Sequence, residues 1–152
     1  MPVGRIIDDE RDISKESGEM ISPGAGGALV IFIGYVKGIV SGKIVMELEY
    51  SSYDPYASQK LEEIAREESE EEGVLDVRIY HRVGRLKPGD PTIYILVSAV
   101  DRKTAFSTAQ RVLERVKHEV PIFKLERRED GEYWVVGGGT RVRRDEMREP
   151  HH

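Results

Sequence analysis

Hydrophobic side chains along this chain recur with two different periods, and the shorter period predicts β-strands. A continuous apolar run over residues 28–33 follows the glycine-rich stretch 24–27 and predicts a strand that is buried on both faces. Alternation of apolar and polar positions predicts two further strands over residues 43–50 and 76–83. The stretch 92–100 is rich in Ile, Val and Tyr, and it predicts a fourth strand.

Apolar positions spaced by three and four residues predict two main helices. The first helix covers residues 55–72, and its Glu-rich outer face is either solvated or a docking surface for a basic partner. The second covers residues 102–119, with Asp101 as its N-cap and Pro121 just past its end. A short helix beginning near Asp12 is also permitted. Four residues fall on one side of the second helix and predict its buried stripe: Phe106, Ala109, Leu113 and Val116.

The last third of the chain predicts a β-hairpin. Residues 122–128 and 132–136 flank an Asp130-Gly131 turn. Three glycines at 137–139 then predict that residues 137–152 form a flexible C-terminal arm. The chain is therefore expected to form a single α+β domain over residues 1–152, with mostly antiparallel strands, two main helices and a C-terminal hairpin.

Composition excludes several classes of function. The 152 residues contain no cysteine, which rules out disulfides, Cys-type zinc sites, iron–sulfur clusters and cysteine nucleophiles. A net charge of −5 argues against a nucleic-acid binder, although basic residues gather in 117–128 and 141–144. No apolar run reaches the roughly 20 residues that span a bilayer. The acidic first ten residues differ from a secretory signal, so we expect a cytoplasmic protein.

No metal site is expected, because the His and acidic residues lack the spacing of metal ligands. His81 lies among the apolar positions of its predicted strand, and we interpret it as a hydrogen-bonded core histidine.

Lys117 is a candidate catalytic residue because of its place on the second helix. It falls beside Leu113 on the apolar flank, where a solubilising lysine is unusual. Partial burial of its ammonium would lower its pKa. The alternative is a lysine that snorkels at the rim of the core.

Lys124 lies seven residues further, past Pro121 and on the following strand, so the chain reverses between the two ammonium groups. If the two lysines converge on one anion, their repulsion lowers the pKa of each and leaves one as a neutral amine. The alternative for Lys124 is an outward-facing strand residue.

Arg102 opens the same helix on its apolar side. It is 15 residues from Lys117, which corresponds to roughly 22 Å along a helix axis. One small ligand cannot contact both side chains in a single chain. Arg102 is therefore either structural, or it meets Lys117 of a second copy in an obligate homodimer.

The segments taken in order resemble the large catalytic subunit of molybdopterin synthase, from about residue 26 to residue 134. The resemblance rests on short motifs in a fixed order: Phe32-Ile33-Gly34-Tyr35-Val36-Lys37, Leu48-Glu49-Tyr50, His81-Arg82-Val83-Gly84, Arg102, Ala105-Phe106, Lys117 and Val120-Pro121-Ile122-Phe123-Lys124. Lys117 and Lys124 fall on the two active-site lysines of that family. The family implies an α/β hammerhead-type fold.

The resemblance implies a sulfur transfer in molybdenum cofactor biosynthesis. A small ubiquitin-like subunit carries a thiocarboxylate on its C-terminal Gly-Gly tail and inserts that tail into the large subunit. Sulfur then passes to cyclic pyranopterin monophosphate and builds the dithiolene of molybdopterin. The family implies a homodimer within a heterotetramer and no resident cofactor. Because the sulfur arrives on the partner, the absence of cysteine is consistent with this scheme.

By position, the resemblance implies a role for each candidate residue. Lys117 would be the principal catalytic lysine, and Lys124 would hold the substrate or intermediate and tune its neighbour. Arg102 would bind the pterin phosphate from the other subunit, and Phe32 would line the pocket.

The sequence departs from the family at three places. Lys37 stands where the family usually has arginine, so a bidentate phosphate clamp becomes a point charge. Asp101 replaces a frequent histidine. Gly137 to Gly139 occupy the region of a further family arginine, for which Arg141 is the candidate replacement. An alternative reading is a non-catalytic binding module for a ubiquitin-like tail or a small anion. We expect neither nucleic acid nor membrane as a partner.

Overall fold

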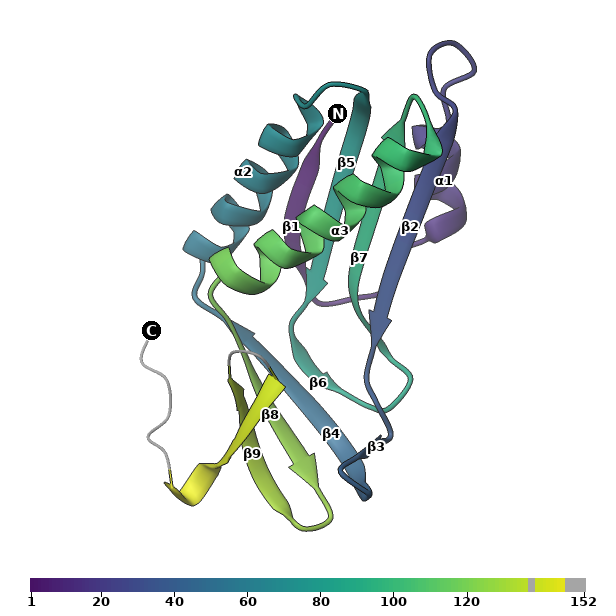
Figure 1. The fold of residues 1–152 in the computed structure, drawn as a ribbon. Helices are drawn as coiled ribbons and strands as arrows, with labels where there is room; N and C mark the ends of the chain where they lie inside the picture. Colours follow the sequence, from purple (N-terminus) through teal and green to yellow (C-terminus); the bar gives the residue numbers. More distant parts are fainter. Residues whose placement is uncertain (137–138, 147–152) are drawn as a thin grey trace.

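The computed structural model of the chain describes residues 1–136 and 139–146. A four-stranded sheet fills the upper part of Figure 1, in the order β1 (Val3–Ile7), β5 (Val74–Arg82), β7 (Pro91–Ala99) and β2 (Ala28–Tyr35). Strand β1 runs parallel to β5, and the other neighbours are antiparallel. The predicted strands over 28–33, 76–83 and 92–100 are confirmed, whereas no pattern in the sequence had indicated β1.

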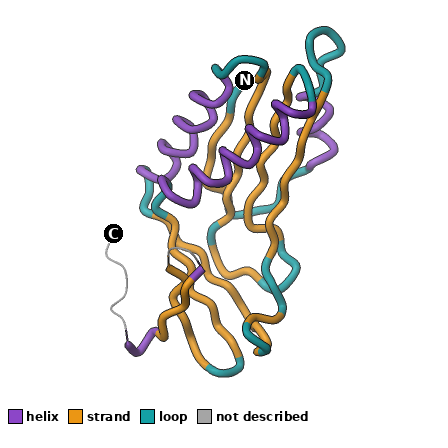
Figure 2. Tube along the Cα trace, in the orientation of Figure 1, coloured by secondary structure: helices purple, strands orange, loops and turns teal. Residues whose placement is uncertain are grey.

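Helices cover both faces of this sheet, as Figures 1 and 2 show. Helices α2 (Tyr56–Ser69) and α3 (Arg102–Glu119) share one face and close the main core with β5 and β7. Helix α1 (Ile13–Met20) packs on the opposite face. Strand β1 approaches α2 so closely that a Cβ at Gly4 would collide with the backbone of Leu61, so this position needs glycine.

The predicted N-cap of α3 is present, and the short helix α1 begins with an equivalent cap. The Asp101 carboxylate accepts a hydrogen bond of 2.9 Å from the Thr104 amide, and the Asp12 carboxylate accepts one of 3.1 Å from the Lys15 amide. Each satisfies an amide that the first turn of a helix leaves without an intrahelical acceptor. The caps fix where α3 and α1 begin.

A second sheet occupies the lower part of Figure 1. Its order is β10 (Thr140–Arg143), β9 (Gly131–Val136), β8 (Ile122–Arg128), β4 (Lys43–Ser52) and β3 (Ile39–Val40), and β6 (Gly84–Leu86) also pairs with β4. A short 3-10 helix, η2 (Arg144–Glu146), follows β10. The predicted hairpin is confirmed as β8 and β9, joined by the turn before Gly131.

The expected C-terminal arm is a strand in part. Thr140–Arg143 pair with β9 over four residues, so this stretch adds an ordered edge to the second sheet. The rest of the predicted arm at 137–138 and 147–152 lies outside the described residues. Among the described residues, no helix is long and apolar enough to cross a membrane.

Two predictions about burial are wrong. Strand β2 is not fully buried on both faces: Val30 packs against the main core and Leu29 and Ile31 against the core under α1, but Phe32 and Ile33 are 36% and 39% exposed. Phe106 is not part of the buried stripe of α3, since it is 64% exposed. The stripe instead consists of Ala105, Thr108, Ala109, Val112 and Val116. Relative to the prediction, the buried side of the helix is rotated by about 60°.

Candidate active site

The two candidate lysines come from consecutive elements. Lys117 lies in the last turn of α3, and Lys124 lies on β8 after a short connection through Pro121. The amide of Val120 donates to the Val116 carbonyl at 3.2 Å, and the helix ends there because the backbone of Val120 is extended. The chain then reverses into the strand, as the proline predicts.

Lys117 is exposed rather than partly buried. The rotation of the buried stripe explains this difference, since Lys117 falls about 120° from the centre of the observed stripe on a helical wheel. The predicted partial burial of Lys117 is therefore wrong. Lys124 is the half-buried member of the pair.

The environment of Lys124 lowers its pKa below the ordinary value for lysine. Burial is the largest cause, followed by the positive charges of Lys117 and Arg141, with a smaller contribution from Lys37. The negative charge of Glu126 opposes the shift. Three of the candidate residues named from sequence thus act electrostatically on the fourth.

Strand register explains why these groups meet on one face of the second sheet. Lys124 pairs directly with Tyr50 of β4 on one side and with Val135 of β9 on the other, and Val135 pairs with Arg141 of β10. Residues directly opposite each other on antiparallel strands project to the same face. Arg141, Lys124 and Tyr50 therefore form one row across the sheet.

Glu126 is the buried counter-charge of this cluster. It follows Lys124 by two residues and so shares its face of β8, and it is only 3% exposed. Its carboxylate accepts hydrogen bonds of 3.2 Å from both Nε and Nη2 of Arg141. Arg141 also donates from Nη1 to the Gly139 carbonyl at 2.8 Å. The arginine is held beside Lys124 by these three bonds.

Tyr50 and His81 line the buried side of Lys124. The Lys124 Nζ lies 5.5 Å from the centre of the Tyr50 ring. The His81 ring meets Tyr50 edge-on, with centroids 5.0 Å apart. The His81 Nδ1 lies 2.8 Å from the Arg82 carbonyl oxygen, and the residue is 5% exposed, which confirms the predicted core histidine.

Lys37 is exposed, and a backbone clamp holds the residue before it. The Val36 amide donates to the Asp90 carbonyl at 3.0 Å, and the Gly89 amide donates to the Val36 carbonyl at 2.9 Å. This clamp fixes the chain after β2 against the turn before β7. The charge of Lys37 reaches Lys124 from there.

Arg102 and Phe32 lie apart from the charges that act on Lys124. Arg102 is exposed at the opposite end of α3 from Lys117, as the helix length requires. Phe32 lies on β2, where alternation places it on the same side as Val30, which packs into the α2 and α3 core. Within one chain, the structure does not bring Arg102 to the lysines.

Sequence reasoning missed Glu126 and Tyr50 as parts of the site. A signal for Glu126 was available, because a residue two positions from Lys124 on a strand shares its face. The signal for Tyr50 was weaker, since its register against β8 depends on how two distant strands pair.

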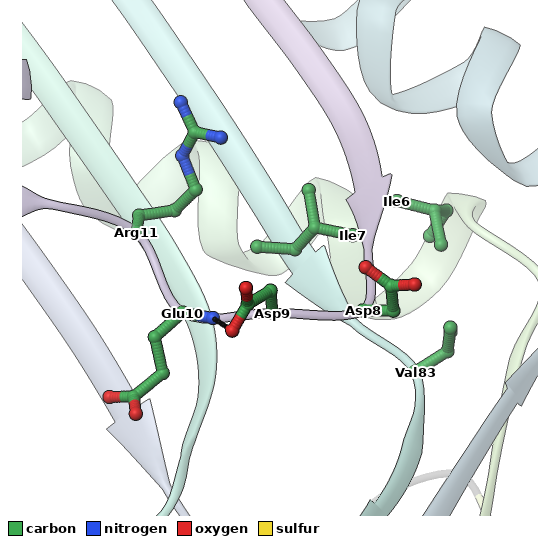
Figure 3. Close-up of a pocket in the computed structure, with 7 residues that line it drawn as sticks. All are labelled: Ile6, Ile7, Asp8, Asp9, Glu10, Arg11 and Val83. Atoms are coloured by element: carbon green, nitrogen blue, oxygen red, sulfur yellow. Dashed lines mark hydrogen bonds between the residues drawn. The ribbon is translucent and has the colours of Figure 1, made fainter.

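A separate hollow of about 450 Å³ lies at the end of β1. Figure 3 shows its lining residues, which are Ile6, Ile7, Asp8, Asp9, Glu10, Arg11 and Val83. None of them belongs to the lysine cluster, and three are acidic. Among the side chains that the structure describes, no group of His, Cys, Asp or Glu is arranged to hold a metal ion.

Comparison with known proteins gives concordant matches. The family described as "MoaE protein" matches residues 6–119. The molybdopterin synthase catalytic subunit of Pyrococcus abyssi is 35% identical over 123 residues, covering 81% of this chain and 83% of the relative. The crystal structure of molybdopterin synthase from Staphylococcus aureus superposes with a TM-score of 0.79 at 34% identity, covering 88% of this chain and 97% of the other.

A further solved structure shares the fold at lower identity. It is described as a complex of subunits 1 and 2 of the molybdopterin-converting factor from Helicobacter pylori, and it matches with a TM-score of 0.67 at 21% identity. The match covers 96% of this chain and 92% of that one.

Proposed function

This chain belongs to the MoaE protein family, and we propose that it acts as the catalytic subunit of a molybdopterin synthase. In this proposal, sulfur passes from the C-terminal thiocarboxylate of a small ubiquitin-like carrier subunit to cyclic pyranopterin monophosphate. The observation that carries the proposal is Lys124, half-buried beside the charges of Lys117, Arg141 and Lys37. A dense cationic face suits a reaction in which both the sulfur donor and the substrate are anions.

The two lysines differ in environment, and the difference supports different roles. Lys117 is exposed, so its ammonium is free to meet the incoming tail and to act as a proton carrier or a transient acyl acceptor. As an acyl acceptor, its neutral amine would bond to the carbonyl carbon and give up a proton, while the carbon–sulfur bond breaks and the sulfur leaves as hydrosulfide, which the pterin takes up. Hydrolysis of the resulting amide would then free the lysine and leave a carboxylate on the carrier tail. Lys124 would hold the substrate or intermediate, and its lowered pKa makes a neutral state more accessible at the reaction pH.

Arg141 and Lys37 would bind the anionic parts of the ligands. Arg141 has a fixed orientation through Glu126 and the Gly139 carbonyl, which supports its use in place of the family arginine that the glycines 137–139 replace. Lys37 would contribute a point charge to phosphate binding. Phe32 would line the pocket with its half-exposed ring.

The position of Arg102 supports a site that is shared between two copies. It is exposed at the far end of α3 from Lys117, so its proposed contact with the pterin phosphate requires Arg102 of a second chain. The assembly would be a homodimer of this chain with a small subunit at each active site, which makes a heterotetramer.

The test is reconstitution of the reaction. The protein is mixed with a thiocarboxylated carrier and cyclic pyranopterin monophosphate, and molybdopterin is measured by mass spectrometry. The proposal predicts product with the unaltered protein and loss of product with Lys117→Ala, while Lys15→Ala on α1 retains activity. Tight binding of the carrier without any product would instead indicate a non-catalytic binding module.

A further inference from the structure

We infer that Tyr50 is a positioning residue, whose ring forms a seat for the Lys124 ammonium and ties it to the junction of the two sheets. This inference deepens the proposed function and rests on it, because it concerns the same site. Tyr50 does not touch the transferred sulfur, and its effect would act through Lys124.

The seat is fixed by the pairing of strands. Tyr50 and Lys124 are direct partners across β4 and β8, so their side chains project to the same face. On its other side, Tyr50 pairs with Gly84 of β6, which has no side chain to compete for that face. The Lys124 Nζ lies 5.5 Å from the ring centre, within the range of a cation–π attraction. The ring therefore favours one position of a side chain that is otherwise long and flexible.

Tyr50 is itself held from the other sheet. It is 6% exposed, and its phenol interacts with the side chain of Thr92, a buried residue of β7. Burial raises the pKa of the phenol to about 12, so the group stays neutral at any reaction pH. His81 of β5 packs edge-on against the ring at 5.0 Å. Residues of the four-stranded sheet thus hold the Tyr50 ring, which belongs to the second sheet.

His81 contributes packing without adding a charge. Burial, together with a smaller contribution from the positive charge of Lys124, lowers the pKa of His81 to about 4. Because this imidazole is neutral, it adds no positive charge that would repel the Lys124 ammonium. The charges that do act on Lys124 come from Lys117 on α3, Arg141 on β10, Glu126 on β8 and Lys37 after β2. Three of these four charges repel the Lys124 ammonium, and the attraction of the Tyr50 ring opposes that repulsion.

The seat has a consequence for proton transfer. Cation–π attraction stabilises the charged form of the lysine, so it works against the burial and the repulsion that lower the pKa of Lys124. Removing the ring should lower that pKa further and leave the amine free to move. Both effects would alter the rate of the reaction more than the binding of the carrier tail.

The experiment replaces Tyr50 with phenylalanines that carry one to four ring fluorines, because fluorination weakens the π face at nearly constant shape. The Lys124 titration is followed by NMR in protein with 13Cε-labelled lysine, and the signal is assigned with Lys124→Arg. We expect the pKa of Lys124 to fall stepwise with fluorine number, by about half a unit to one unit in total. Tyr50→Leu should give the full shift.

Tyr133 provides the matched control. It is a buried tyrosine of β9 that lies beneath Arg128 and Arg143, and Tyr133→Leu should leave the titration of Lys124 unchanged. A Lys124 pKa that does not respond to fluorination, or that responds equally to Tyr133→Leu, would overturn the inference.

Turnover separates this inference from the proposed function. If the Tyr50 ring positions Lys124, fluorination should lower kcat and shift the pH profile of kcat, with little change in KM for the carrier. If product forms normally and the titration is flat, the seat alone is wrong. If the titration responds but the unaltered protein makes no molybdopterin, the seat for Lys124 stands and the proposed function fails.

Discussion

The Glu126 carboxylate and the Arg141 guanidinium form a bidentate ion pair, with Nε and Nη2 of the arginine each 3.2 Å from a carboxylate oxygen. The acid belongs to β8 and the base to β10, and the pair spans the strand between them. This contact brings the C-terminal strand into the candidate site. It also supplies the negative charge that keeps the pKa of Lys124 from falling further.

Glu126→Gln tests both effects of that contact. We expect the free energy of unfolding to fall by about 1–3 kcal/mol, since a charged hydrogen-bond acceptor is lost at a buried position. The pKa of Lys124 should fall, because the charge that opposes the shift is removed. Urea denaturation and lysine NMR measure the two quantities. Glu129→Gln, at an exposed position of the hairpin turn, is the control, and an unchanged pKa of Lys124 in Glu126→Gln would contradict the assigned role.

His81 predicts a loss of stability in mildly acidic solution. Its pKa is about 4 in the folded protein, mainly through burial, against an ordinary value of 6.5. Between these values the unfolded chain binds a proton that the folded chain does not, so the free energy of unfolding falls as the pH falls. The loss should reach about 3 kcal/mol by pH 4. Chemical denaturation between pH 7 and 4 should follow this slope, and His81→Gln should flatten it whereas His118→Gln should not.

Glu16 predicts a second loss at lower pH. Burial raises the pKa of this carboxylate, but hydrogen bonds from Tyr80, Arg11 and Arg78 overcome that effect and hold the pKa at about 2. Its stabilisation is complete above the ordinary value of 4.5 and is lost as the pH falls toward 2. The loss should be about 3 kcal/mol.

Acid titration of Glu16→Gln checks this window. Stability of that variant should change less than that of the unaltered chain between pH 4.5 and 2, with Glu10→Gln as the exposed control. If Glu16→Gln keeps the full acid slope, then Glu16 is not the group responsible.

The shared site can be tested by mixing two inactive variants. Arg102→Ala and Lys117→Ala should each lack activity if both residues serve one site across a dimer. A hybrid dimer carries one site with both defects and one intact site, so random exchange of subunits should restore about a quarter of full activity. Sulfur transfer is measured before and after exchange. Failure to recover activity in a mixture shown to contain hybrids would contradict a site shared between two copies.

Local signals predicted the parts of the fold that depend on neighbouring residues. The cap at Asp101, the proline after α3 and the turn before Gly131 act over a few residues, and each element they bound is present. Strand β1 escaped prediction because its pairing with β5 depends on residues more than seventy positions away. Strand β10 pairs with the neighbouring strand β9 and was missed for a local reason, because the glycines at 137–139 indicated a flexible arm.

The sequence indicated several residues of the candidate site, but it did not indicate how they are arranged. The reversal after Pro121 indicated that Lys117 and Lys124 lie near enough to interact, and the charge of Lys117 does contribute to the lowered pKa of Lys124. The rotation of α3 against the sheet determines which of the two lysines is buried. The exposed side chain of Phe106 shows that this rotation was predicted wrongly. The row from Arg141 to Tyr50 depends on the register of four strands, and no local pattern encodes that register.

Lys117 and Lys124 share one electrostatic site, and the proposed function depends on this relationship. The most direct measurement is the titration of Lys124 by NMR in Lys117→Ala, compared with Lys103→Ala at the other end of the same helix. We predict that the pKa of Lys124 rises in Lys117→Ala, because a repelling charge is removed, and stays unchanged in Lys103→Ala. An unchanged pKa of Lys124 in Lys117→Ala would contradict the claim.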